Sequence, residues 1–320
     1  MLTSVQDIGR LNRQDAGVPP GGAMDRFSHR IANFLVGNDD YAATLELAGG
    51  RFSAMVERGG LLAYTGAGGR LYCNKKELPG NRTLFVPKNA VLEIEPADTG
   101  NYAYLAACGG WQVPEVLGSR STCLAAGFGG FEGRVLRKGD VLNTLRSSDD
   151  FESSDEYHPG EIFTSNWFVQ EQISETDIRV MPGPEINRWS EKDERRFFNT
   201  DFIVSTQRDR MGIRLGGSEI IPSEKKEMLS TAVMPGTIQI PPDGNPVVLM
   251  ADAQTTGGYP RIAQVIAVDI PRMAQISSGQ HVRFQKVTLE EAEQLYFERE
   301  SLLRKIQLAL LFKLRQYVIR

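Results

Sequence analysis

Histidine and cysteine are scarce in this 320-residue sequence, which has three of each. His29, His158 and His281 stand far apart and lack the spacing of metal ligands, so we expect no transition-metal site. The cysteines are odd in number and widely spaced, which is typical neither of a disulfide framework nor of a metal-binding motif. We therefore expect a reducing, cytoplasmic location.

Long apolar runs and an excess of positive charge are also missing. No run approaches the roughly 20 apolar residues that a membrane-spanning helix needs, so we do not expect a membrane protein. The polar start of the chain, Met1 to Asp7, does not resemble a signal peptide. A formal net charge of -4 argues against a general nucleic-acid-binding protein, which usually carries a basic stripe.

Several well-known sequence signatures are absent. There is no Gly-x-x-x-x-Gly-Lys-Ser/Thr loop of the kind that holds nucleotide phosphates, and no Gly-x-Ser-x-Gly nucleophile elbow. A Met-Lys-Met biotin-attachment sequence is missing as well. If biotin chemistry takes place here, the biotin arrives on another chain.

Short runs typical of β-strands make up most of the sequence, which contains 32 Gly and 16 Pro. These runs are bounded by Gly, Pro, Asn or Asp, and strands do not alternate regularly with helices, which disfavours a doubly wound sheet. The sequence therefore predicts a mainly β protein. The predicted strands are Leu61–Tyr64, Leu84–Val86, Val91–Ile94, Tyr102–Ala106, Ile178–Val180, Ile203–Ser205, Ile238–Ile240, Val247–Met250, Val265–Val268 and Val282–Phe284.

Three segments are expected to be helical. Apolar residues from Phe27 to Leu35 recur at helical spacing, and Gly37 suits the end of that helix. Pro184–Phe198 has a Pro and a Glu near its start. From Leu289 to Arg320, acidic residues precede basic ones, which suits the helix dipole, and the last part is unusually apolar.

A polar, acidic stretch over residues 147–160 is typical of a linker and separates two β-rich halves. We expect an N-terminal half over residues 1–146, a C-terminal half over 161–288 and a helical tail over 289–320. An exposed apolar helix usually needs cover from its own domain or from a partner chain. A helix lying on a membrane surface is the less favoured alternative.

Two polar, glycine-rich blocks in the first half are candidate ligand sites. Residues 5–25 contain Gln6 and Asp7 and end with Asp25, and glycines there could let the backbone approach an anion at a helix start. The alternative is a structural turn in which Asp25 caps the helix. The second block covers residues 116–122, in which Arg120 stands beside hydroxyls such as that of Ser121. This arrangement suits a carboxylate or carboxamide, although a solvated surface Arg fits equally well.

A third block, residues 208–215, is rich in arginine. In an extended segment Arg208, Arg210 and Arg214 would share one face, where an anion or carboxylates must neutralise them. Structural pairing with Asp209 or Asp243 is the alternative explanation.

The fourth block offers hydroxyls, an amide and a pair of glycines. Such a donor-rich loop could hold a developing oxyanion, and a simple connection between strands seldom needs all of these groups together. Its members are Gln254, Thr255, Thr256, Gly257, Gly258 and Tyr259.

Taken in order, these blocks resemble the family known as the carboxyltransferase C subunit or allophanate-hydrolase subunit 2. The family includes the C subunits of 5-oxoprolinases, an antagonist of a sporulation-kinase inhibitor and the carboxyltransferase part of urea amidolyase. The resemblance covers about residues 3 to 285. The matching segments are Val5-Gln6-Asp7-x-Gly9-Arg10, Gly17-Val18-Pro19-x-x-Gly22-Ala23-Met24-Asp25, Ala32-Asn33-x-Leu35-Val36-Gly37-Asn38, Gly109-Gly110, Val116-Leu117-Gly118-Ser119-Arg120-Ser121-Thr122, Asp209-Arg210-Met211-Gly212-Ile213-Arg214-Leu215, Pro235-Gly236-x-Ile238-Gln239-x-Pro241-x-Asp243-Gly244 and Gln254-Thr255-Thr256-Gly257-Gly258-Tyr259-Pro260.

The resemblance implies two cyclophilin-like β-barrel halves with a ligand cleft between or along them. It also implies a small B-type partner and, for 5-oxoprolinase members, an A-type partner and ATP-dependent opening of 5-oxo-L-proline to L-glutamate. The sequence departs from the family in two places. The apolar tail is an addition, and Cys108, which we expect to be a free buried thiol, stands where a small inert residue is usual.

On that basis each block receives a hypothetical role. Arg120, Arg210 or Arg214 would bind the substrate carboxylate, with Gln6, Ser121, Gln254 and Tyr259 lining the site. The hydroxyls of Thr255 and Thr256 and the amides of Gly257 and Gly258 would stabilise the carbonyl oxygen, with Asp7 or Asp25 as proton acceptor.

Two other functions stay open. The chain could be part of a biotin-dependent carboxyltransferase that carboxylates urea or a related amide, using the same donors. It could also be a non-catalytic protein that binds a kinase inhibitor resembling the B-type partner.

Overall fold

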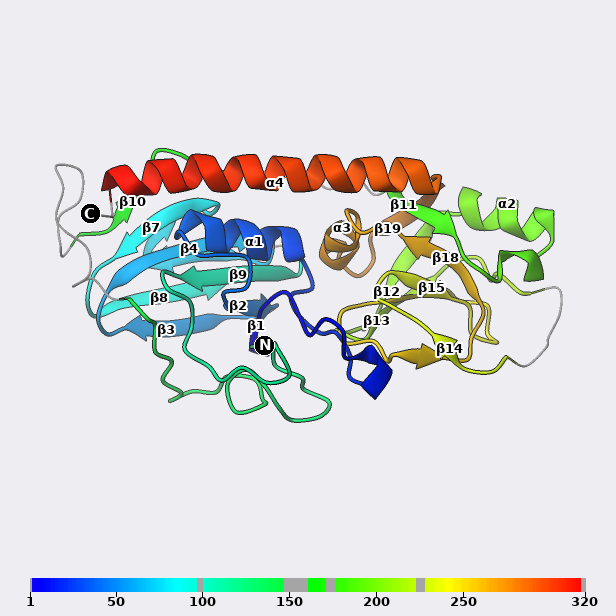
Figure 1. Ribbon diagram of the computed structural model, residues 1–320, viewed down its shortest axis with the longest axis horizontal. Coiled ribbons are helices and arrows are strands. Elements are labelled where there is room, and N and C mark those ends of the chain that lie inside the picture. Colours follow the sequence, from blue (N-terminus) through cyan, green and yellow to red (C-terminus); the bar gives the residue numbers. More distant parts are fainter. Residues whose placement is uncertain (1, 97–99, 147–160, 171–176, 223–227, 318–320) are drawn as a thin grey trace. The chain divides into compact units, whose positions relative to one another are not determined.

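The computed structural model describes residues 2–96, 100–146, 161–170, 177–222 and 228–317 (Figure 1). Contacts within the chain divide it into two compact units. Unit 1 comprises Met1–Gly9, Asp25–Gln172 and Ser301–Arg320, and unit 2 comprises Arg10–Met24 and Ile173–Glu300. The predicted linker over residues 147–160 lies outside the described residues.

These units differ from the predicted boundaries because of long-range contacts. Residues 10–24 group with unit 2, where the amide of Gly21 donates to the carbonyl of Ala251. The predicted tail is divided, since its residues from Ser301 onward group with unit 1. There Leu314 is buried and packs against Gly37. A Cβ added to Gly37 would lie 3.4 Å from Cδ1 of Leu314.

Unit 1 contains two antiparallel sheets that share one apolar core. The six-stranded sheet has the order β1 (Leu2–Gln6), β2 (Thr44–Ala48), β9 (Tyr102–Ala107), β4 (Gly60–Gly66), β7 (Arg82–Val86), β10 (Phe163–Thr164). The four-stranded sheet has the order β3 (Phe52–Val56), β8 (Ala90–Glu95), β5 (Arg70–Cys73), β6 (Lys76–Leu78). Their inward-facing side chains alternate with exposed ones, most clearly along β8, as expected for strands with one buried face.

Helix α1 (Arg26–Leu35) lies across the six-stranded sheet and confirms the predicted first helix (Figure 1). Asp25 caps it by accepting a hydrogen bond from the amide of Ser28, and Gly37 follows its end with a φ of 77°. The buried face is partly polar. The hydroxyl of Thr65 donates to the carbonyl of Ser28, and that of Thr83 donates to the carbonyl of Leu35.

Unit 2 is built on a closed barrel of seven strands (Figure 1). The ring runs β11 (Asp177–Pro182), β18 (Arg261–Val265), β15 (Thr237–Gln239), β16 (Val247–Leu249), β13 (Gly212–Gly216), β12 (Phe202–Arg208), β19 (His281–Lys286), and the parallel pair β11 and β19 closes it. A short pair, β14 (Thr231–Ala232) and β17 (Thr256–Gly257), stands beside it. The mainly β fold expected from the sequence is confirmed. Every predicted strand overlaps an observed one, although β18 ends at Val265, where the predicted strand Val265–Val268 begins.

Three aromatic side chains pack together in the apolar core of unit 2. Phe197, Phe202 and Phe284 are fully buried, and the ring centroids of Phe197 and Phe284 lie 5.0 Å apart. Phe197 comes from α2 (Glu191–Asn199), which begins later than predicted because Ser190 is extended and caps it. Unit 2 also contains the 3-10 turns Gln14–Ala16 and Ile186–Arg188 and helix α3 (Ile270–Gln275).

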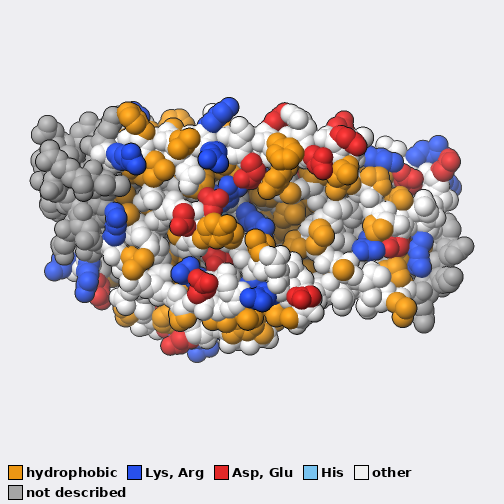
Figure 2. All heavy atoms as spheres, in the orientation of Figure 1, with side chains coloured by type: hydrophobic (Ala, Val, Ile, Leu, Met, Phe, Trp, Pro, Cys, Tyr) orange, Lys and Arg blue, Asp and Glu red, His pale blue; other side chains and the backbone are white. Residues whose placement is uncertain are grey.

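Helix α4 (Leu289–Tyr317) confirms the helix predicted at the end of the chain. Leu303, Leu310 and Leu314 are buried, whereas Phe297 and Phe312 are exposed. Along the edge where Figure 1 places α4, Figure 2 shows hydrophobic side chains interspersed with charged ones. In the part of the chain that the structure describes, no helix is both long and apolar enough to span a membrane.

A buried histidine on α1 makes the stability of the protein depend on pH. His29 is fully buried and lies 2.9 Å from the hydroxyl of Thr44, through Nδ1. Because a buried imidazolium loses its hydration, the pKa of His29 falls from 6.5 to about 4. Below its ordinary pKa the unfolded chain binds a proton that the folded chain does not bind.

We expect the free energy of unfolding to fall by on the order of 3 kcal/mol as the pH is lowered from 6.5, the ordinary pKa of His29, to about 4, its pKa in the folded chain. Urea denaturation of the wild type and of His29→Gln across this pH range measures the effect. The variant should lack this part of the pH dependence while keeping the part due to carboxyl groups. Identical pH profiles for the two proteins would show that His29 is not its source.

Candidate functional site

The predicted site residues fall into two groups, one within each unit. In unit 1, Asp7 follows β1 directly and its carboxylate is surrounded by donors. Oδ1 accepts hydrogen bonds from the hydroxyls of Ser119 (2.7 Å) and Ser121 (2.5 Å) and from the amide of Gly9 (2.8 Å), and Oδ2 accepts one from the amide of Arg120 (2.5 Å). Burial opposes ionisation, but these hydrogen bonds outweigh it and lower the pKa of Asp7. A carboxylate stabilised in this way is a weak proton acceptor, and its contacts join two distant segments of the chain.

The other predicted residues of unit 1 are also held by the protein itself. Gln6 is fully buried and donates to the hydroxyl of Ser4. Asp25 is the cap of α1, which confirms the structural alternative for that residue. The half-exposed guanidinium of Arg120 lies 3.4 Å from Glu115. This group therefore ties loops to the sheet.

In unit 2 the arginine-rich segment forms a hairpin. The carboxylate of Asp209 accepts a hydrogen bond from the amide of Met211, so the chain turns between β12 and β13. The prediction that Arg208, Arg210 and Arg214 share one face of an extended strand is therefore wrong. Arg208 ends β12, Arg210 lies in the turn, and Arg214 lies on β13.

Arg210 is engaged in a buried ion pair. Its Nε donates to Oδ2 of Asp252 (2.7 Å), and its Nη2 donates to Oδ1 of Asp252 (2.9 Å) and to the carbonyl of Gly22 (2.7 Å). The residue is 8% exposed. These contacts tie residues 10–24 to the barrel, which is a structural task.

Arg214 occupies a different position, on the outer face of the barrel. Val247 on β16 pairs with Arg214 on one side and with Gln239 of β15 on the other. Residues paired in this way point to the same face of a sheet, so these three form one outward row. The next row points inward and is fully buried; it consists of Ile213, Val248 and Ile238.

A cavity of about 520 Å³ lies over this outer row. Its walls come from the end of β12, from β13, β15 and β16, and from the loop after β16. The lining residues are Thr206, Gln207, Arg208, Asp209, Met211, Gly212, Arg214, Gln239, Pro241, Val247, Leu249, Gln254 and Tyr259. The structure thus brings Arg214, Gln254 and Tyr259 together, as the sequence predicted for a ligand site.

The rest of the fourth block lies beside this cavity and does not line it. Thr255, Thr256, Gly257 and Gly258 connect Gln254 to Tyr259, and Thr256 and Gly257 form β17. Gly257 packs against Gln239, since an added Cβ would lie 2.5 Å from its side-chain nitrogen. This part of the loop therefore helps to position the lining residues.

The guanidinium of Arg214 retains donors for a ligand. Nη1 donates to Oδ2 of Asp243 (2.5 Å), and Arg214 makes no other hydrogen bond with the described residues. Burial opposes ionisation of Asp243, but the hydrogen bonds from Arg214 and Asn245 outweigh it and lower the pKa of that carboxyl. The structural alternative, pairing of an arginine of this block with Asp243, is confirmed for Arg214. The pair uses one nitrogen of the guanidinium, and the other nitrogens make no hydrogen bond with the described residues.

Gln239 is a lining residue that the sequence did not single out as a site residue. It is 2% exposed, and its Nε2 donates to the carbonyl of Tyr259 (3.1 Å). A glutamine between Ile238 and Ile240 in a predicted strand looks like an ordinary strand residue. Gln239 could have been identified from the alternation of side chains along a strand. If Ile238 and Ile240 face the core, the residue between them must face outward.

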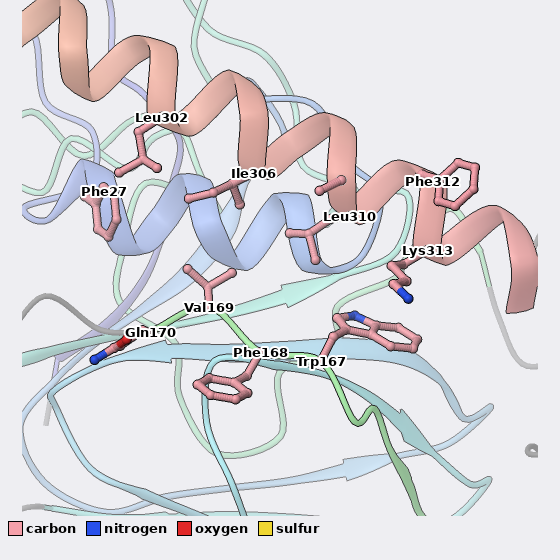
Figure 3. Close-up of a pocket in the computed structure, with 11 residues that line it drawn as sticks. Phe27, Trp167, Phe168, Val169, Gln170, Leu302, Ile306, Leu310, Phe312 and Lys313 are labelled. Carbon is pink, nitrogen blue, oxygen red and sulfur yellow. The ribbon is translucent and has the colours of Figure 1, made fainter.

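A second cavity, of about 580 Å³, lies within unit 1 and is largely apolar (Figure 3). Figure 3 shows Leu302, Ile306 and Leu310 of α4 facing Phe27 and the segment from Trp167 to Gln170. Among its described lining residues, Lys313 alone carries a charge. This cavity suits an apolar group better than a small charged substrate.

Comparison with known proteins places the chain in a family. The model for the carboxyltransferase domain, subdomain A and B, matches residues 16–286. The chain belongs to this family. It is 38% identical to the 5-oxoprolinase C subunit of Escherichia coli (strain K12) over 305 residues, covering 93% of this chain and 94% of that protein. It is 33% identical to the 5-oxoprolinase C subunit of Haemophilus influenzae over 304 residues, covering 95% of this chain and 94% of that protein.

A solved structure shares the fold of this chain. The structure of Kluyveromyces lactis urea carboxylase matches with a TM-score of 0.84 and 28% identity, covering 95% of this chain. This chain spans 28% of that much longer protein.

The two arginines of unit 2 should respond differently to substitution. Arg210→Met leaves the partly buried Asp252 without its partner, so we expect a loss of about 2 kcal/mol in the free energy of unfolding. Arg214→Met removes a half-exposed pair and should cost less than about 1 kcal/mol. Chemical denaturation of both variants measures the difference. Equal losses would contradict the division between a structural Arg210 and an available Arg214.

Proposed function

We propose that this chain works as the C subunit of a 5-oxoprolinase and helps convert 5-oxo-L-proline to L-glutamate together with partner subunits. The observation that carries the proposal is the 38% identity to a 5-oxoprolinase C subunit over nearly the full length of both chains. The cavity of unit 2 supports it, because it joins an available guanidinium to amide and hydroxyl groups. We further propose that the complex is cytoplasmic.

The substrate is a small lactam that carries a carboxylate. We propose that Arg214 binds this carboxylate, since a guanidinium fork forms paired, charge-assisted hydrogen bonds with carboxylates. Gln254 and Tyr259 border the same cavity and complete its walls. The hydroxyls of Thr255 and Thr256 stay proposed donors to the lactam carbonyl, from the loop next to it.

The helix starts of this chain do not fit a nucleotide. A phosphate can bind at the start of a helix when the free backbone amides there are not already occupied by an acidic side chain of the protein. In every α-helix that the structure describes, an acidic side chain stands at the cap or in the first turn: Asp25 for α1, Glu191 for α2, Asp269 for α3 and Glu290 for α4. We therefore propose that ATP binds to one of the partners, of the A or B type.

A biotin-dependent carboxyltransferase acting on urea or a related amide is the second candidate. The likeness to the Kluyveromyces lactis urea carboxylase favours it, but at 28% identity and over 28% of that protein. The 5-oxoprolinase subunits match at higher identity and over almost their whole length.

The deciding assay uses this chain co-purified with the products of its neighbouring genes. We expect release of glutamate from 5-oxo-L-proline that requires ATP and all subunits. Biotin-dependent carboxylation of urea without glutamate release would support the second candidate. Stable association with a small B-type partner, with neither activity, would support a non-catalytic binding protein.

Substitution of Arg214 tests the proposed carboxylate site in that complex. Arg214→Met should raise KM for 5-oxo-L-proline about 10- to 100-fold and change kcat little, because a charge-assisted bond made equally to substrate and transition state is lost. Asp243→Asn is the matched control. It keeps the guanidinium and should not raise KM. A normal KM for Arg214→Met would remove Arg214 from the site.

A further inference from the structure

The outer row of the barrel places two different polar groups on either side of one small side chain. Arg214 and Gln239 both pair with Val247, from opposite neighbouring strands. With two strand spacings between them, their Cα atoms are about 10 Å apart, and both side chains rise from the same face. A ligand resting over Val247 therefore meets a cation on one side and an amide on the other.

The amide of Gln239 has a defined orientation. A carbonyl can only accept hydrogen bonds, so the group facing the carbonyl of Tyr259 must be the NH2 of the side chain. The other end of the amide, Oε1, is an acceptor. No residue in the described parts of the chain donates a hydrogen bond to Oε1, although Gln239 is almost completely buried. Gln239 lines the cavity, so this acceptor is accessible to a ligand and favours one that brings a donor.

Two local features fix Gln239 in this position. The register between β15 and β18 shifts between Ile238 and Gln239, and such bulges redirect side chains. Gly257 then allows the loop to pass against the amide, where any Cβ would collide with it.

We propose that Oε1 of Gln239 accepts a hydrogen bond from the ring N–H of the substrate and makes the site selective for lactams over the corresponding lactones. In 5-oxo-L-proline the N–H and the carboxylate are carried by neighbouring ring atoms. Arg214 and Gln239 line one cavity, so that edge of the ring can meet Arg214 with its carboxylate and Gln239 with its N–H. The inference rests on the proposed function, and it adds the residue that distinguishes an amide from an ester.

The test measures binding by titration calorimetry of the assembled complex, without ATP, for 5-oxo-L-proline and for its lactone analogue, in which oxygen replaces the ring N–H. The wild type should bind the lactam roughly 10- to 100-fold more tightly, because the lactone has no donor for Oε1 and sets its ring oxygen against that acceptor. Gln239→Met, which keeps the size of the side chain, should bring the two affinities to within a few-fold of each other.

Gln207→Met is the matched control, since Gln207 is an exposed glutamine that lines the same cavity. It should leave the ratio of the two affinities unchanged, whereas general damage to the fold would weaken both ligands equally. A Gln239→Met protein that keeps the wild-type ratio overturns the inference, as does a wild-type complex that binds neither ligand. Selective binding without glutamate release would count against the proposed function and leave the role of Gln239 supported.

Discussion

The register of three neighbouring strands in the closed barrel is the constraint on which the candidate site depends. Ile213, Val248 and Ile238 fill the barrel interior, so the adjacent row must face outward. Because side chains alternate along a strand, a slip of one residue would bury Arg214 inside the barrel and expose an isoleucine. The apolar core and the polar site are therefore specified by the same pairing.

Polar side chains serve two purposes in this protein, as the pair Asp7 and Arg210 and the pair Arg214 and Gln239 illustrate. Asp7 accepts hydrogen bonds from hydroxyls and amides, and Arg210 donates to both oxygens of Asp252, so each is satisfied by its own unit. Such groups stabilise one arrangement of the loops. Arg214 and Gln239 keep hydrogen-bonding capacity directed at a cavity. Unused capacity at a cavity marks the candidate site, since Gln6 also has a buried side-chain oxygen without a partner among the described residues but lines neither described cavity.

Sequence patterns predicted what local interactions determine. The helix that Asp25 caps and the strands of both units followed from capping, spacing and turn residues. The hairpin at Asp209 was missed although Asp209 and Gly212 stand at the two ends of its turn, because the run of arginines was taken as one extended segment. Long-range contacts were also out of reach. They group residues 10–24 with unit 2 and place Gln239 in the same cavity as Arg214.

The central claim is that unit 2 holds the lactam between Arg214 and Gln239. A crystal structure of the assembled complex with 5-oxo-L-proline tests it most directly. The account predicts the ligand carboxylate within hydrogen-bonding distance of the Arg214 guanidinium, with the ring nitrogen facing Oε1 of Gln239. A ligand bound elsewhere, with this cavity filled only by water, would contradict it.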